Sequence, residues 1–194
     1  MWRDSKDSLV ACDDGKVEKL GWRSSKTVIA CILWGIEAGL PKRAALAPAT
    51  VDGLDATSVV SGLMLSLGAA GSPLLLDSLT TAGFNVVSPL GVARLVDSPT
   101  IVVYTYKPSL DRLVSALQSA QLPFSEARIR LLSLVERVFE AETRKGRLYL
   151  LAWGLDREEA VELVESAQIH ARKPEPLRIA HYTASEASEA LPAV

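Results

Sequence analysis

The sequence predicts one mixed α/β domain in which antiparallel strands come first and parallel strands then alternate with helices. Its 194 residues, 48% of them apolar, are enough to bury a substantial core in a single unit spanning residues 1–194. The first fifty residues alternate apolar stretches with short turns, as in a strand meander. From Asp55 onward, apolar residues recur at helical spacing between short, wholly apolar strands.

The meander is predicted from apolar stretches separated by Gly21, Gly39 and Pro41. The expected strands are residues 8–12, 16–22, 27–36 and 43–51. A helix is then expected to begin at Asp55 and to end near the glycines Gly68 and Gly71. Its apolar face consists of Val59, Val60, Leu63, Met64 and Leu67.

Two short apolar stretches, residues 73–77 and 100–105, are typical of strands in the middle of a parallel sheet. A short helix over residues 89–96 is expected between them. A further helix follows Pro108, with Leu110, Leu113, Val114 and Leu117 on one face. A longer helix is expected next, with a buried stripe of Leu131, Leu134, Val135, Val138 and Phe139.

The last third of the chain adds a strand over residues 147–153 and two helices. Asp156 and Glu159 have the spacing of a capping box, which predicts a helix through Ala167. Pro174 and Pro176 introduce the final helix. A meander followed by helix, parallel strand, helix and parallel strand is the element order of the ribonuclease H-like fold.

Aspartates follow the predicted strands in the segments CDDG (residues 12–15), VDGLDAT (51–57) and LLLDS (74–78). In this fold the first strand neighbours the next parallel strand, so Asp13 and Asp77 should lie side by side, with Asp55 at the adjoining helix start. Alternation along a strand sends Asp13 and Asp14 to opposite faces, and we choose Asp13. Clustered carboxylates repel one another unless a cation or a proton compensates them.

We therefore expect Asp13, Asp55 and Asp77 to be ligands of one or two Mg²⁺ ions, with Mn²⁺ as a substitute. Such a site would serve phosphodiester cleavage. Taken alone, Asp55 could instead cap its helix, and Asp52 with Gly53 could form a turn.

Composition restricts the partners and the compartment. The formal charge of −2 and a pI near 5.8 provide no overall attraction to a polyanion, so nucleic-acid binding would need a local basic surface. Cys12 and Cys31 lie in apolar stretches and are expected to be buried free thiols. Residues 1–9 lack a signal-peptide apolar region, and no apolar run would cross a membrane. We expect a soluble cytoplasmic protein, and nothing in the sequence indicates a homo-oligomer.

The chain resembles an archaeal family of largely uncharacterised proteins related to endonuclease V, some of them described as endonuclease dU. The resemblance covers residues 8–190 and rests on residues 51–57 (VDGLDAT), 76–77 (LD), 81–87 (TAGFNVV), 99–103 (PTIVV) and 174–181 (PEPLRIAH). It implies a magnesium-dependent endonuclease that acts near deaminated bases, deoxyuridine or deoxyinosine, in DNA, with a role in DNA repair. It also implies that Asp13, Asp55 and Asp77 are catalytic and that His181 adds a further polar group.

The chain departs from endonuclease V at several positions. Ser78 replaces the glycine that usually follows the strand-end aspartate, and Asp55 replaces a longer glutamate. No proline-tyrosine-isoleucine-proline wedge is present. Lys107, Arg178 and Gly83 are the candidates for substrate binding. Two other functions stay open: a catalytically inactive nucleic-acid-binding member of the same fold, and a small-nucleotide hydrolase.

Overall fold

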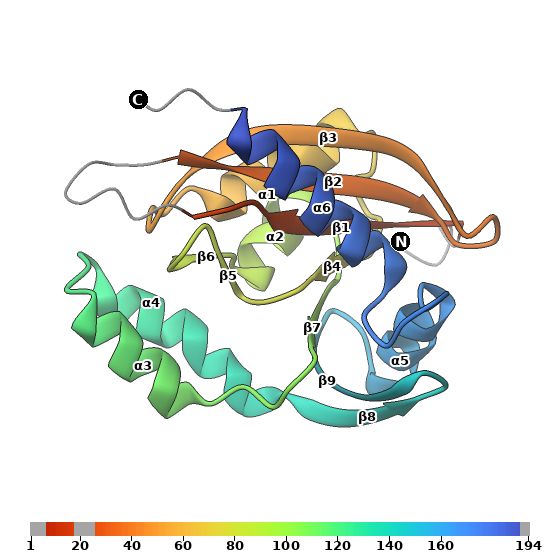
Figure 1. Ribbon diagram of the computed structural model, residues 1–194. Helices are drawn as coiled ribbons and strands as arrows, with labels where there is room; N and C mark the ends of the chain where they lie inside the picture. Colours follow the sequence, from red (N-terminus) through yellow and green to blue (C-terminus); the bar gives the residue numbers. More distant parts are fainter. Residues whose placement is uncertain (1–6, 18–25, 191–194) are drawn as a thin grey trace.

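The computed structural model describes residues 7–17 and 26–190, and a mixed seven-stranded sheet is its centre (Figure 1). The strand order is β3-β2-β1-β4-β7-β9-β8. The strands are β1 (Ser8–Asp14), β2 (Lys26–Gly35), β3 (Leu40–Thr50), β4 (Leu74–Leu76), β7 (Thr100–Tyr104), β8 (Phe139–Thr143) and β9 (Gly146–Trp153). Strands β1 to β3 pair antiparallel, β4 and β7 run parallel to β1, and β9 and β8 are antiparallel additions.

Helices cover both faces of this sheet (Figure 1). They are α1 (Ala56–Ser66), α2 (Pro89–Val96), α3 (Leu110–Ser119), α4 (Ser125–Leu132), the 3-10 helix η2 (Ser133–Arg137), α5 (Arg157–Ser166) and α6 (Glu175–Glu189). Helices α1 and α2 share one core with the sheet, whereas α5 and α6 share the other, with α6 lying on β1 and β2. None of the helices in the described part of the chain is long and apolar enough to span a bilayer.

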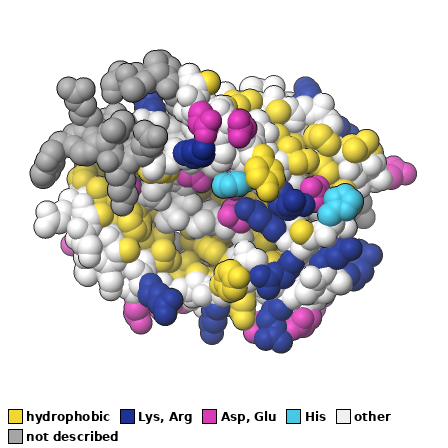
Figure 2. Space-filling model, viewed as in Figure 1, with side chains coloured by type: hydrophobic (Ala, Val, Ile, Leu, Met, Phe, Trp, Pro, Cys, Tyr) yellow, Lys and Arg dark blue, Asp and Glu magenta, His cyan; other side chains and the backbone are white. Residues whose placement is uncertain are grey.

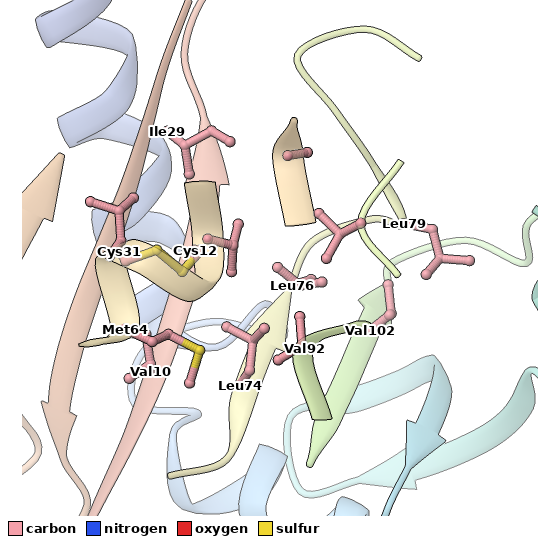
Figure 3. Packing of buried hydrophobic residues seen from close by; sticks show 14 of the residues in the cluster. Val10, Cys12, Ile29, Cys31, Met64, Leu74, Leu76, Leu79, Val92 and Val102 are labelled. Carbon is pink, nitrogen blue, oxygen red and sulfur yellow. A yellow bond between two sulfur atoms is a disulfide. The ribbon is translucent and has the colours of Figure 1, made fainter. Parts of the chain in front are cut away.

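Successive side chains of β1 point alternately into the two cores, one on each face of the sheet. Leu9 and Ala11 point to the side of α5 and α6, and Val10 and Cys12 point to the side of α1 and α2. Figure 3 shows the second group, with Val10 and Cys12 beside Met64 of α1. The same alternation directs the residues that follow Cys12 to opposite faces of the sheet.

The prediction of free thiols was wrong, because Cys12 and Cys31 form a disulfide (Figure 3). The two residues lie directly opposite each other on the antiparallel strands β1 and β2, with their Cα atoms 4.1 Å apart. Opposed residues in such a ladder have neighbouring side chains. The pairing register therefore brings the sulfurs together, and the spacing of the two cysteines in the sequence does not specify that register.

Reduction of this disulfide should lower stability. The bridge closes a loop with a sequence separation of 19, for which the chain-entropy model predicts about 3 kcal/mol. For a chain of this length the melting temperature should fall by roughly 6–12 °C. Calorimetry of oxidised and reduced protein measures the change, with thiol alkylation after unfolding to verify each redox state. The Cys12→Ala, Cys31→Ala double variant should not respond to reductant, and an equal response would contradict the assignment.

Most predicted elements are confirmed, within one to three residues at their ends. Helix α2 has the predicted bounds, and Asp156 and Glu159 form the expected capping box. The predicted strand at residues 16–22 lies mostly outside the described residues, and Lys16 and Val17 are not in a strand. The hairpin of β5 (Thr80–Thr81) and β6 (Asn85–Val86) was not predicted.

The prediction of a long helix with a buried stripe from Leu131 to Phe139 was wrong beyond Leu132. Helix α4 stops at Leu132, η2 continues to Arg137, and Phe139 opens strand β8. Val138 and Phe139 satisfy helical spacing, but β8 gains a full antiparallel ladder with β9. That long-range pairing outweighs local periodicity, which cannot report it.

Candidate functional site

Asp13 and Asp77 lie at the same edge of the sheet. Strands β1 and β4 are parallel neighbours, and Cys12 pairs with Leu76, so the next residue on each strand is one of the two aspartates. Ligand sites in open α/β sheets lie beyond the carboxyl ends of parallel strands. The structure thus brings together the two aspartates that the sequence analysis placed side by side.

Lys173 links these two carboxylates. Its Nζ lies 3.0 Å from Oδ1 of Asp77 and 3.5 Å from Oδ2 of Asp13. Lys173 is in the connection between α5 and α6, directly before the Pro174-Glu175-Pro176 segment. The sequence analysis did not include it in the site, because no local pattern indicates that the ammonium reaches two strands far away in the chain.

His181 approaches the same carboxylate from α6. Its Nδ1 lies 3.2 Å from Oδ2 of Asp13, and half of its side chain is exposed. The approach of α6 to the end of β1 depends on Gly15, since a Cβ there would collide with the carbonyl oxygen of Ala184. The glycine of the CDDG segment therefore has a packing role that places His181 over Asp13.

The electrostatics of Asp13 are unusual. Burial raises the pKa of its carboxyl group to about 7; Lys173 partly opposes the rise, and the charges of Asp77 and Asp14 add to it. The side chain is 8% exposed, and Oδ1 accepts a hydrogen bond from the backbone N–H of Asp14 at 2.9 Å. At Asp13 the effect of burial on the pKa therefore outweighs the opposing effect of the Lys173 charge.

Asp14 faces the other side of the sheet, as strand alternation predicts. Its Oδ2 accepts a hydrogen bond of 2.6 Å from the backbone N–H of Ala82, in the β5–β6 hairpin. Burial raises the pKa of this carboxyl group also, against the lowering effect of that hydrogen bond. Asp14 therefore anchors the hairpin, whereas Asp13 faces α6.

Asp55 is bound elsewhere. Its carboxylate accepts hydrogen bonds from the N–H and the hydroxyl of Thr50, the latter at 2.8 Å, and from Nδ2 of Asn85 at 2.5 Å. Burial tends to raise the pKa of Asp55, but these hydrogen bonds lower it below its ordinary value. It does not cap α1 with its side chain; instead Oδ1 of Asn85 accepts from the N–H of Ala56.

The expected trio of aspartates is consequently not preassembled. Residues 7–17 and 26–190 contain no group of three or more His, Cys, Asp or Glu side chains arranged to hold a metal ion. Asp13 and Asp77 flank an ammonium group, and Asp55 is held by Thr50 and Asn85.

The three residues expected to bind substrate have different surroundings. Arg178 forms an ion pair of 3.0 Å with Glu175, one turn earlier in α6. Lys107 is exposed after β7 and has no hydrogen bond or ion pair with another described residue. Gly83 has φ +77°, and a Cβ there would collide with the carboxylate of Asp52, which accepts from the N–H of Phe84 at 2.7 Å. The structure thus assigns Gly83 to the turn of the hairpin.

A small cavity lies between the two aspartates and the start of the hairpin. Asp13 and Asp77 line it together with Ser78, Thr80 and Thr81. The hydroxyl of Ser78 lies 3.0 Å from that of Thr80 and accepts from the Thr80 N–H, so it shapes the turn that closes the cavity. Tyr104 borders this region, and burial raises the pKa of its hydroxyl to about 12, so it stays protonated.

The surface beside the site carries positive charge. Figure 2 shows basic side chains gathered next to a histidine on the face that carries α6. Arg172 stacks over the ring of Tyr106 at 5.6 Å, and its guanidinium donates to the carbonyl of Arg147 at 3.2 Å. Tyr106 is 80% exposed. A basic patch that the net charge of the whole chain conceals is therefore present on the face that carries α6 (Figure 2).

The mixed sheet and the acidic cluster at its carboxyl edge define a domain of the ribonuclease H-like class. Among solved structures the chain is similar to endonuclease V from Bacillus subtilis, with a TM-score of 0.61 and 12% identity, covering 93% of this chain and 80% of that one. It is also similar to endonuclease V from Ciona intestinalis in complex with DNA containing an inosine, with a TM-score of 0.57 and 12% identity, covering 95% and 86%.

Residues 7–188 match the endonuclease dU family, to which this chain belongs. A UPF0215 protein from Aeropyrum pernix is 58% identical over 182 residues, or 94% of this chain and 98% of that protein. A protein of unknown function from Archaeoglobus fulgidus has a TM-score of 0.79 at 25% identity, covering 93% of this chain and 97% of that one. The family and the fold together support a nuclease related to endonuclease V.

Removing the Asp13 charge should stabilise the protein when a chelator excludes metal ions. The folded pKa of about 7 lies above the ordinary 3.8, so Asp13 favours the folded state fully below about pH 4, and this contribution is lost as pH rises to 7. A difference of three pKa units between the folded and unfolded states corresponds to at most about 4 kcal/mol of unfolding free energy. At pH 8 we expect Asp13→Asn to melt at a higher temperature than wild type, with no difference near pH 4.

Thermal melts from pH 4 to 8 in chelator measure this effect. Asp97→Asn, which removes an exposed carboxylate at the end of α2, is the matched control and should follow the wild-type curve. A wild-type curve parallel to that of Asp13→Asn over the whole range would contradict the raised pKa.

Proposed function

We propose that the chain is a metal-dependent endonuclease that cleaves phosphodiester bonds near deaminated bases, deoxyuridine or deoxyinosine, in DNA, and so serves DNA repair. The observation that carries this proposal is the placement of Asp13 and Asp77 at the carboxyl ends of adjacent parallel strands, with His181 over Asp13. Membership in the endonuclease dU family supports it. The Ciona intestinalis relative in fold, in complex with inosine-containing DNA, supports the class of substrate.

The residues fit a divalent cation in their chemistry. Asp13 and Asp77 provide carboxylate oxygens, the ligands that Mg²⁺ and Mn²⁺ prefer, and His181 presents an imidazole nitrogen next to them. The ammonium of Lys173, which contacts both carboxylates, supports the proposal that a positive charge can be bound at this position. When bound there, a divalent ion would lower the pKa of an attacking water and neutralise charge on the phosphodiester.

The other parts of the site would bind and orient the substrate. Lys107 and Arg172 place positive charge where a phosphate backbone could pass the acidic cluster. The exposed ring of Tyr106 offers a surface on which an unpaired base can stack. His181, half exposed and in contact with Asp13, can hold a proton near the leaving oxygen.

A catalytically inactive nucleic-acid-binding protein is the second candidate. The position of Lys173 favours it, because an ammonium already compensates the two carboxylates. Such a protein would bind DNA equally well with and without Mg²⁺ and would cleave nothing.

The decisive experiment is cleavage of end-labelled single- and double-stranded DNA that contains deoxyuridine, deoxyinosine or no lesion, with matching RNA. Each substrate is incubated with Mg²⁺, Mn²⁺ or chelator, using wild type and Asp77→Asn in parallel. The expected result is metal-dependent nicking near the deaminated base by wild type alone. DNA binding without any nicking would favour the inactive protein, and turnover of free nucleotides without polymer cleavage would favour a small-nucleotide hydrolase.

A further inference from the structure

Lys173 is held in place by its own connection as well as by the aspartates. Nε2 of Gln168 donates to the carbonyl of Arg172 at 2.6 Å, and the N–H of Glu175 donates to the carbonyl of Ala167 at 2.8 Å. Pro174 is buried directly after Lys173. The backbone on both sides of Lys173 is therefore anchored, so its side chain can leave the site without a movement of the connection.

A divalent cation bound by Asp13 and Asp77 would compete with the ammonium of Lys173 for the same oxygens. Lys173 Nζ lies 3.0 Å from one carboxylate and 3.5 Å from the other, and its side chain is 24% exposed. A Mg²⁺ ion would bind such oxygens at about 2.1 Å, which leaves no room for an ammonium between them. An ammonium group and a divalent ion held by the same two carboxylates would also repel each other strongly in a partly buried site.

We propose that Lys173 is an internal counter-ion that holds Asp13 and Asp77 together until a divalent cation displaces it, and that the displaced ammonium then binds a phosphate of the nucleic acid. This inference rests on the proposed function for the identity of the second ligand. The long flexible stem of lysine lets the charge move by several ångströms while its Cα stays fixed. Arg172, the residue directly before Lys173, also carries a positive charge and stacks over the exposed ring of Tyr106.

We expect the substitution of Lys173 to change Mn²⁺ binding and DNA binding in opposite directions. Lys173→Met removes the competing charge but keeps an unbranched side chain, so Mn²⁺ should bind about five- to thirtyfold more tightly. In Ca²⁺, used as a non-cleaving ion, the same variant should bind deoxyuridine-containing DNA about three- to tenfold more weakly, because one phosphate contact is lost. A purely structural role for Lys173 would weaken both interactions or neither.

Mn²⁺ binding is measured by electron paramagnetic resonance of the free ion and by calorimetry, and DNA binding by fluorescence anisotropy. Lys173→Arg, which keeps the charge, should bind Mn²⁺ as weakly as wild type. Lys42→Met is the matched control: Lys42 lies beside Ser8 at the opposite end of β1 and should leave both affinities unchanged. Circular dichroism establishes that each variant is folded.

Equal or weaker Mn²⁺ binding by Lys173→Met, or no Mn²⁺ binding by any of the proteins, would overturn the counter-ion role. Unchanged DNA affinity in that variant would overturn the phosphate contact. Neither measurement depends on cleavage. Tighter Mn²⁺ binding by Lys173→Met, in a protein whose wild type never nicks DNA, would therefore refute the proposed nuclease activity while the counter-ion role stands.

Discussion

Replacing Asp77 by asparagine is expected to lower the rate of metal-dependent nicking by on the order of 10³ while leaving the protein folded. The substitution keeps the size of the side chain but removes one of the two carboxylates that flank Lys173. Loss of a charged metal ligand removes several kcal/mol of transition-state stabilisation, and each 1.36 kcal/mol changes the rate tenfold. Asp77 is 35% exposed, so its replacement should hardly change the core.

Single-turnover nicking of a lesion-containing duplex measures this loss. The variant should also bind Mn²⁺ more weakly, because only Asp13 would remain of the carboxylate pair. Asp97→Asn is again a suitable control, since it removes an exposed carboxylate outside the site. Nicking by Asp77→Asn at the wild-type rate would exclude the acidic pair as the catalytic centre.

Replacing Arg128 by methionine is expected to cost about 3–5 kcal/mol of folding stability. Arg128 belongs to α4, is 2% exposed and donates hydrogen bonds to four backbone carbonyls. These belong to Pro123, Gly53, Phe84 and Asp52, and the contact with Asp52 measures 2.7 Å. Methionine fills much of the volume but leaves those carbonyls without their donor, and each unsatisfied buried group is costly.

The melting temperature of Arg128→Met should therefore fall by roughly 6–20 °C. Arg130→Met is a matched control, because Arg130 is in the same helix, is 80% exposed, and forms an ion pair with Glu126 at 3.7 Å. Exposed pairs of this kind contribute less than about 1 kcal/mol. Similar melting temperatures for the two variants would show that Arg128 does not join α4 to the loop before α1 and to the β5–β6 hairpin.

Local signals in the sequence predicted most of the fold. The apolar stretches of β2 and β7, the helical spacing of α1 and the capping box of Asp156 each specify their element through neighbouring residues. The same local information placed Asp13 and Asp77 at strand ends, and the order of elements placed those strands side by side. The predicted aspartate pair of the site follows from these two facts.

Contacts between residues far apart in the chain could not be predicted from the sequence. Phe139 has the spacing of a helical residue, but its pairing with Leu150 of β9 makes it part of a strand. In the sequence, Cys12 and Cys31 look like separate buried thiols, but the register of β1 and β2 places them directly opposite each other. Asp55 has the position of a helix cap, yet Thr50 and Asn85 bind its carboxylate.

The sequence by itself determined the class of fold, the order of the elements and the aspartates at the strand ends, because propensity, periodicity and capping act between residues close in the chain. Only the tertiary structure decided the disulfide, the position of Asp55 and the charge balance of the site. Lys173 lies 160 residues from Asp13 in the chain, and its ammonium reaches the carboxylate only after α6 has packed against β1. Contacts of that kind depend on the assembled sheet and its register, which no local pattern encodes.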